Sequence, residues 1–178
     1  MTVEEGVTEI GNYMFQNTKL TSVTLPNSVT KIGASAFNGC SLTTINFGQG
    51  VKTIENSAFQ NCGELTEIIL PDATETLGQN AFGDCPKLAK ISLGKNMKTL
   101  EAYCFVGYSK GCPLLGDIIC RATTPPTLKD DYGTGPFGGG WSPVAGKASL
   151  LRTGSSTFRN RPIRSAVREP TPTLRGLN

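Results

Sequence analysis

The chain has 178 residues, of which 38% are hydrophobic and 17% charged, with a formal net charge of +3 and no histidine. This length is enough for one sizeable domain, and the near-normal apolar content argues against a largely disordered chain. No stretch approaches the roughly 20 consecutive apolar residues of a membrane-spanning helix, so no membrane insertion is expected. The lack of histidine excludes Ser-His-Asp and Cys-His nucleophile pairs and histidine-ligated zinc.

The N-terminal residues, Met1 to Gly6, have neither the basic nor the apolar region of a signal peptide. Either the protein is cytoplasmic, or its signal lies on a part of a parent chain outside this sequence. Because the first repeat begins close to Met1, we expect a fragment of a longer protein.

Five apolar columns repeat through the first part of the chain with a period of 22 or 23 residues. The most regular column is Phe15, Phe37, Phe59, Phe82 and Phe105. The others are Ile10, Ile32, Ile54, Leu77 and Leu100; Leu20, Leu42, Leu65 and Leu88; Val23, Ile45, Ile68 and Ile91; and Leu25, Phe47, Leu70 and Leu93. A unit this small cannot bury its apolar side chains alone, whereas stacked copies form a continuous core. The columns therefore predict a β-rich solenoid.

The unit over residues 20–40 shows how each coil is expected to fold. Its β-branched residues predict a strand that turns Val23 and Leu25 to one face. Pro26 then ends the strand, because it has no amide hydrogen for a sheet ladder. Phe37 is expected to anchor a short turn or 3-10 segment that leads back to the next strand.

The sequence of this unit, LTSVTLPNSVTKIGASAFNGC, resembles the BspA-like class of bacterial leucine-rich repeats, whose pattern is close to LxxIxLPxxVxxIGxxAFxxC. The resemblance covers about residues 7–128 and implies a right-handed solenoid with no catalytic residue and no cofactor. It also implies a bacterial cell-surface or secreted protein that binds proteins or host matrix. Residues 122–128, ATTPPTL, resemble the terminal unit of such arrays, and Pro125 and Pro126 are expected to block further strand pairing.

Three cysteines, Cys40, Cys62 and Cys85, occupy one repeat position, three residues after the column phenylalanines. Their spacing fits no zinc motif, so no metal site is predicted and we expect reduced, buried thiols that pack coil to coil. The remaining cysteines, Cys104, Cys112 and Cys120, fall outside this column. A disulfide between Cys112 and Cys120 in an oxidising compartment stays an open alternative, since sequence cannot place their Cα atoms.

Charge and composition change just after the run Gly138 to Gly140. Residues 1–140 carry ten basic and thirteen acidic residues, a net of −3, whereas residues 141–178 carry seven basic residues, six of them Arg, against Glu169 alone, a net of +6. We therefore predict a repeat array over 1–128, a Gly/Pro-rich linker over 129–140 and a basic, largely irregular tail over 141–178. The tail is expected to be the least ordered part of the chain, with few contacts to the solenoid.

The origin of the tail has several interpretations. It is a disordered Arg-rich extension, a chimeric or frameshifted end, or a remnant of another domain. Residues 151–156, LRTGSS, and 161–168, RPIRSAVR, resemble the closing segment of formylglycine-generating-enzyme-like domains, which share a C-type-lectin-like fold. The catalytic cysteines of that family have no counterpart here. Nucleic-acid binding is not predicted, because only Trp141 and Phe158 are available to stack on bases.

Two rows of outward strand positions form the predicted partner-binding face: Ser22, Thr44, Glu67 and Lys90, and Thr24, Asn46, Ile69 and Ser92. The main functional hypothesis is a monomeric, non-enzymatic module that presents this face to a protein or glycan. The alternative is a structural spacer that carries a C-type-lectin-like ligand-display module. The rows hold no Trp, Tyr or Arg, the residues that dominate binding hot spots, so they identify no ligand. Asp130 and Asp131 are not a catalytic pair, because adjacent residues on a strand point to opposite faces.

Overall fold

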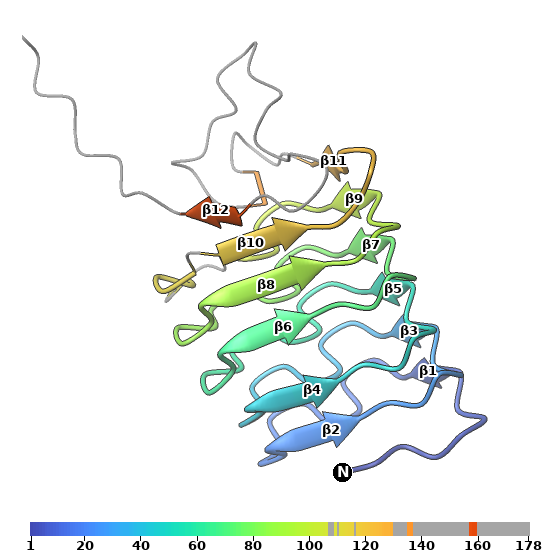
Figure 1. The fold of residues 1–178 in the computed structure, drawn as a ribbon. Coiled ribbons are helices and arrows are strands. Elements are labelled where there is room, and N and C mark those ends of the chain that lie inside the picture. The colour runs from blue at the N-terminus through green and yellow to red at the C-terminus, as the bar shows by residue number, and fades with distance from the viewer. Residues whose placement is uncertain (107–108, 110, 116, 130–134, 137–156, 160–178) are drawn as a thin grey trace, which may run out of the picture.

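The structure, a computed structural model, describes residues 1–106, 109, 111–115, 117–129, 135–136 and 157–159. Within these residues the chain winds into a stack of coils, each of which adds one strand to either side of the stack (Figure 1). The described residues contain strands and turns and no helix. The predicted β-rich solenoid is therefore confirmed.

One side of the stack is a six-stranded parallel sheet of two-residue strands, which we call the short-strand sheet. Each strand pairs in register with the equivalent residues of the next coil, so that Ile10 lies beside Ile32 and Ile32 beside Ile54. The strands, in sheet order, are β1 (Glu9–Ile10), β3 (Lys31–Ile32), β5 (Thr53–Ile54), β7 (Thr76–Leu77), β9 (Thr99–Leu100) and β11 (Thr127–Leu128).

The other side of the stack, which we call the long-strand face, is divided into two sheets. Two strands form the first: β2 (Ser22–Thr24) and β4 (Thr44–Asn46). Four form the second, in the order β12 (Thr157–Arg159), β10 (Asp117–Cys120), β8 (Lys90–Leu93) and β6 (Glu67–Ile69). The pairs within these sheets are parallel, except that β12 is antiparallel to β10.

The break between β4 and β6 coincides with a change in the length of the preceding bend. The coil before the break has one residue between its column cysteine and leucine, Cys40-Ser41-Leu42, whereas the coil after it has two, Cys62-Gly63-Glu64-Leu65. The coils that follow keep the longer bend, and their strands β6, β8 and β10 pair with one another. We attribute the break to this extra residue. Two strands pair in register only when the bends that lead into them have the same length.

The predicted phenylalanine column forms a stack of rings through the core. Successive centroids from Phe15 to Phe82 lie 5.1 to 5.2 Å apart, and Phe105 follows Phe82 at 6.4 Å. Four of the rings are buried, whereas Phe15, at the N-terminal end, is only half-buried. The stack is thus confirmed, but the prediction that all five rings are buried is wrong for Phe15, because the structure has no further coil beneath it.

The segments that carry Phe15, Phe37, Phe59 and Phe82 are runs of turns, each with two residues in the left-handed conformation, four positions apart. In the second coil these are Ser35 and Gly39, with φ of 54° and 73°. Asn and Asp occupy the second position in other coils, as Asn17, Asn61 and Asp84, and these residues tolerate positive φ. Each left-handed residue stops the chain from continuing as a helix, so the expected 3-10 alternative does not form in the described residues.

The alternation of proline and glycine after the long strands follows from contact between coils. A Cβ atom on Gly48 would lie 2.0 Å from the Pro26 carbonyl oxygen, and one on Gly94 would lie 2.1 Å from that of Pro71. A glycine is therefore required where the backbone of one coil rests on the proline of the coil before it.

The C-terminal end of the stack differs from the sequence expectation. Thr157–Arg159 form β12 and pair with Asp117–Ile119, so the prediction that the tail makes few contacts with the solenoid is wrong for these three residues. In the segment expected to be a linker, the carbonyl oxygens of Gly135 and Pro136 accept hydrogen bonds from the amides of Tyr103 and Phe105. The remaining residues of the tail lie outside the described part of the chain, as do Asp130 and Asp131.

Candidate functional site

All eight predicted partner-binding residues lie on strands of the long-strand face. The register pairs Ser22 with Thr44 and Thr24 with Asn46 in the first sheet. In the second sheet, Glu67 lies beside Lys90 and Ile69 beside Ser92. The six residues on β2, β4 and β6 are exposed, and the two on β8 are half-buried. The two rows therefore exist, although the break between β4 and β6 interrupts both.

The charged members of this face neutralise each other. Lys90 Nζ lies 2.6 Å from Glu67 Oε1 on the neighbouring coil. Equivalent pairs join Lys87 to Glu64 at 2.6 Å and Lys95 to Asp72 at 3.0 Å. Because each pair joins opposite charges on adjacent coils, the described side chains of these pairs add little net charge to the face.

A hollow of about 390 Å³ lies at the break between the two sheets, and sequence reasoning missed it. Most of its lining comes from β4, β6 and the residues that follow them: Ile45, Asn46, Phe47, Gln49, Ile69, Leu70, Pro71 and Asp72. The last lining residue, Arg121, follows β10. The sequence feature that marks the position of the hollow is the extra residue between Cys62 and Leu65, to which we attribute the separation of β6 from β4.

The hollow has an apolar rim. Ile69 is 58% exposed, although its neighbours in the same row are polar. Ile45 is half-buried, whereas its counterparts in the other coils, Val23 and Ile68, are buried. Ile69 is exposed because it occupies an outward position of β6, and the inward Ile45 is only half-buried at the edge of β4 that no described strand pairs with, so the two isoleucines form an apolar patch at the break.

Arg121 closes one end of the hollow and joins three coils. Its Nε donates to the Leu93 carbonyl at 3.2 Å and its Nη2 to the Leu70 carbonyl at 2.8 Å. Its Nη1 lies 3.1 Å from the Asp72 carboxylate, which also pairs with Lys95. The hydrogen bond from Lys95 and the charge of Arg121 lower the pKa of Asp72. Arg121 is thus held by the protein itself, with a structural role at the hollow.

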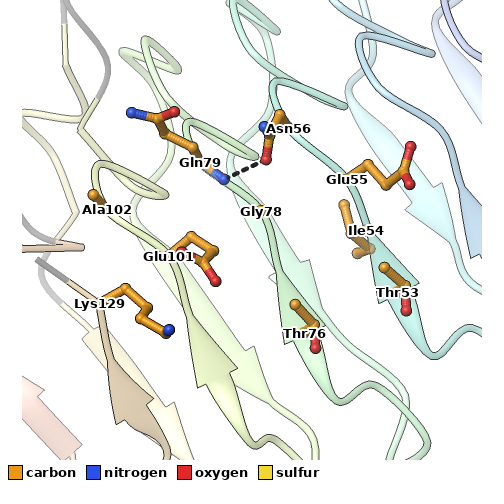
Figure 2. A pocket seen from close by; sticks show the side chains of 10 residues that line it. All are labelled: Thr53, Ile54, Glu55, Asn56, Thr76, Gly78, Gln79, Glu101, Ala102 and Lys129. Carbon is orange, nitrogen blue, oxygen red and sulfur yellow. Dashed lines mark hydrogen bonds between the residues drawn. The ribbon is translucent and has the colours of Figure 1, made fainter. Parts of the chain in front are cut away.

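A second hollow, of about 440 Å³, lies on the short-strand sheet (Figure 2). It is polar, with Thr53, Thr76, Glu101 and Lys129 among its lining residues. Beside it, Glu55 accepts from the Ala34 amide at 3.1 Å and pairs with Lys31 at 3.0 Å, and its hydrogen bond to Lys31 raises the pKa of that lysine. Glu55 and Lys31 are thus engaged in contacts between coils, so this hollow is the weaker candidate for a binding site.

The repeats match a known family. The sequence signature of the BspA type leucine-rich repeat region fits residues 1–112 in six copies. This chain belongs to that family. No curated protein sequence shows a significant match.

Solved bacterial structures share the fold of this BspA-type array. A leucine-rich cell surface protein from Faecalibacterium prausnitzii is 27% identical, with a TM-score of 0.63, over 67% of this chain and 31% of that one. The pneumococcal vaccine antigen PcpA is 27% identical, with a TM-score of 0.64, over 70% of this chain and 30% of the antigen. A leucine-rich repeat protein from Bacteroides ovatus is 32% identical, with a TM-score of 0.58, over 70% of this chain and 30% of its own. The chain thus spans about a third of the length of these proteins.

The leucine-rich repeat fold is generally a non-enzymatic scaffold. No group of three metal-ligating side chains occurs among the described residues. In the same residues, no helix has the length and apolar character needed to cross a membrane.

The cysteines of the array confirm one prediction and correct another. Cys40, Cys62 and Cys85 are free and buried, as expected from their shared register. Cys112, expected outside this column, belongs to it: its Sγ donates to the Phe82 carbonyl at 3.3 Å, as Cys85 Sγ does to that of Phe59. Cys112 and Cys120 are both free thiols, so the structure does not contain the disulfide considered between them.

Proposed function

We propose that this array is a protein-binding module of a bacterial cell-surface or secreted protein, and that the long-strand face around the hollow between β4 and β6 contacts the partner. The observation that carries the proposal is Ile69, a large apolar side chain that is 58% exposed beside the half-buried Ile45. Exposed apolar side chains in a hollow with a polar surround are typical of protein interaction sites.

The surroundings of Ile69 fit this role. Asn46 on β4 and Ser92 on β8 flank it and supply polar groups for a rim. The hydrogen bonds from Arg121 to the carbonyls of Leu70 and Leu93 fix the backbone on one side of the hollow. A partner that binds there would therefore lose little affinity to ordering of the backbone. The surface location is supported by the cell-surface protein from F. prausnitzii, which shares the fold.

The test is capture of surface and extracellular proteins by the full chain, with chemical crosslinking, followed by measurement of the affinity of each captured protein. The decisive variant is Ile69→Glu, which puts a charge on the rim. The matched control is Leu114→Glu, since Leu114 is 61% exposed and lies in the bend before β10, outside the lining of the hollow. We expect Ile69→Glu to weaken binding at least about tenfold, as for a hot-spot residue.

Three outcomes separate the hypotheses. Loss of a captured protein with Ile69→Glu but not with Leu114→Glu supports the proposed face. Equal binding by both variants and the unmodified chain rules out this face as the contact surface. The absence of any captured protein favours the structural spacer, the alternative function considered from the sequence.

A further inference from the structure

Four cysteines form a column along the phenylalanine stack. Each thiol donates to the carbonyl oxygen of the phenylalanine in the preceding coil, at 3.0 to 3.3 Å. The members are Cys40, Cys62, Cys85 and Cys112. Cys112 joins the column although six residues, 106–111, separate it from Phe105, whereas two separate cysteine from phenylalanine in the earlier coils.

Neighbouring thiols in this column are one coil apart. The coils are in register here, since the Phe59 amide donates to the Ala81 carbonyl at 2.8 Å and the Phe82 amide to that of Cys104 at 2.8 Å. Backbones paired in this way lie roughly 4.7–4.9 Å apart, and disulfides join residues whose Cα atoms are about 4.4–6.8 Å apart. The fold therefore brings adjacent members of the column within the separation that a disulfide bridges.

The last pair of the column differs from the others in two respects. Cys112 is half-buried, whereas Cys40, Cys62 and Cys85 are at most 2% exposed. The Cys85 thiol is also placed to donate a hydrogen bond to a Cys112 thiolate, an interaction that raises the pKa of Cys85 and lowers that of Cys112. Burial instead raises the pKa of Cys62 to about 12. Cys112 is therefore the member best suited to react as a thiolate.

We propose that Cys85 and Cys112 form a redox-active thiol pair, in which Cys112 reacts with a small-molecule disulfide and Cys85 then closes an internal disulfide. The pair lies at the C-terminal end of the described column, where the distance between the Phe82 and Phe105 ring centroids widens to 6.4 Å. Cys120 is excluded as the partner because it is buried at the end of β10, beside Leu93, outside the column.

The chemistry needs one disulfide oxidant such as oxidised glutathione. The Cys112 thiolate attacks one sulfur of the oxidant, so that a mixed disulfide forms and one glutathione thiolate leaves with the proton that Cys112 has lost. The Cys85 thiol then attacks the Cys112 sulfur, and the second glutathione leaves with the Cys85 proton. Two protein thiols are oxidised and one small-molecule disulfide is reduced to two thiols.

The test uses the full chain, reduced, freed of reductant and equilibrated with oxidised glutathione, then alkylated and digested for mass spectrometry. We expect a linked pair of peptides that contain Cys85 and Cys112, with a loss of two hydrogens. In the reduced protein, Cys112 should alkylate about tenfold or more faster than Cys62, given its exposure and thiolate fraction. The Cys85→Ser variant should accumulate glutathione on Cys112, because the resolving thiol is missing.

Cys62→Ser is the matched control, since it removes a thiol from the same column without touching the pair, and it should still form the Cys85–Cys112 bond. Thermal melting of each variant identifies any that has failed to fold, and Cys85→Ala then replaces Cys85→Ser. A persistent glutathione adduct on Cys112 of the unmodified chain, or a bond from Cys112 to Cys120, would overturn the proposal. Equal alkylation of Cys62 and Cys112 would also overturn it.

Discussion

Phe59 lies at the middle of the ring stack, with Phe37 and Phe82 on its two faces and Phe47 against its edge. The Phe47 ring is 5.7 Å away and nearly perpendicular, at 79°. A leucine occupies the position of Phe47 in three other coils, as Leu25, Leu70 and Leu93, so the aromatic side chain fills additional core volume at the coil next to the break. These contacts make Phe59 the residue on which neighbouring coils depend most directly.

We predict that Phe59→Ala lowers the free energy of unfolding by about 3–5 kcal/mol, because it removes a fully buried ring and leaves a cavity. Phe15→Ala is the matched control and should cost clearly less, since Phe15 is half-buried and stacks on one side only. Urea unfolding followed by circular dichroism measures both values. Equal costs would contradict a stack whose members support one another.

The buried thiols give the array a predicted dependence on alkaline pH. Burial raises the pKa of Cys62 from 9.0 to about 12 in the folded chain. In the unfolded chain this thiol loses its proton above about pH 9, so the unfolded state binds fewer protons and is favoured as the pH rises. The contribution of Cys62 is therefore complete below pH 9 and is lost progressively up to about pH 12.

The measurement is urea unfolding with reductant at about pH 8 and about pH 10. Above pH 9, each buried thiol of this kind lowers the free energy of unfolding by up to about 1.4 kcal/mol per pH unit. Cys62→Ala should have a smaller loss between the two conditions than the unmodified chain. The difference between the two proteins isolates Cys62 from the other groups that titrate in this range. An identical pH dependence would show that the thiol is not held neutral by burial.

At the scale of single elements, the inserted segment before Cys112 is fixed by a buried carboxylate. Asp84 is 2% exposed, and its Oδ1 accepts from the amides of Ser109 and Gly111 at 2.9 and 2.8 Å. Its Oδ2 accepts from Gln60 Nε2 at 3.2 Å. Asp84 occupies the left-handed position that Gly39 and Asn61 fill in earlier coils. The same residue therefore adopts the required backbone conformation and binds the amides of Ser109 and Gly111.

We predict that Asp84→Gly destabilises the chain by about 1–3 kcal/mol more than Asn61→Gly, because it leaves two backbone amides without their charged acceptor. Glycine suits the left-handed conformation at both positions, so backbone strain does not enter the comparison. Hydrogen exchange should show loss of protection at Ser109 and Gly111 in Asp84→Gly only. Unchanged protection there would mean that the carboxylate does not hold the insertion.

At the scale of the whole molecule, chain segments pair with both outer strands of the stack on the long-strand face, β2 at the N-terminal end and β10 at the C-terminal end. At the N-terminal edge, the Val3 amide donates to the Thr24 carbonyl at 3.0 Å and the Thr24 amide to that of Met1 at 2.9 Å. At the C-terminal edge, β12 pairs antiparallel with β10. Uncovered edges are the usual route by which sheets pair between molecules, so covered edges oppose association.

We therefore predict that the chain is a monomer, with a mass of 18.9 kDa by light scattering. Deletion of residues 1–3 uncovers β2 and should produce association that increases with concentration. A dimer of the unmodified chain would contradict the prediction. A deletion variant that stays monomeric would show that the N-terminal residues do not protect this edge.

The sequence by itself determined the coil and its core. The Phe, Leu and Ile columns, the buried positions of Cys40, Cys62 and Cys85 and the outward rows on the long-strand face all follow from a fixed period, because each coil repeats the environment of the one before it. A resemblance to BspA-like repeats reached the same fold. Periodic features could be predicted since they depend on neighbours one repeat away.

Only the tertiary structure decided what happens where the period changes. The hollow with Ile69, the entry of Cys112 into the thiol column and the pairing of β12 with β10 each occur where a coil gains residues or the repeat ends. One extra residue before Leu65 is visible in the sequence, but its effect depends on whether β6 can still align with β4. The candidate site combines the two, because the outward position of Ile69 follows from the repeat, whereas the partial exposure of Ile45 occurs at the edge of β4 that no described strand covers.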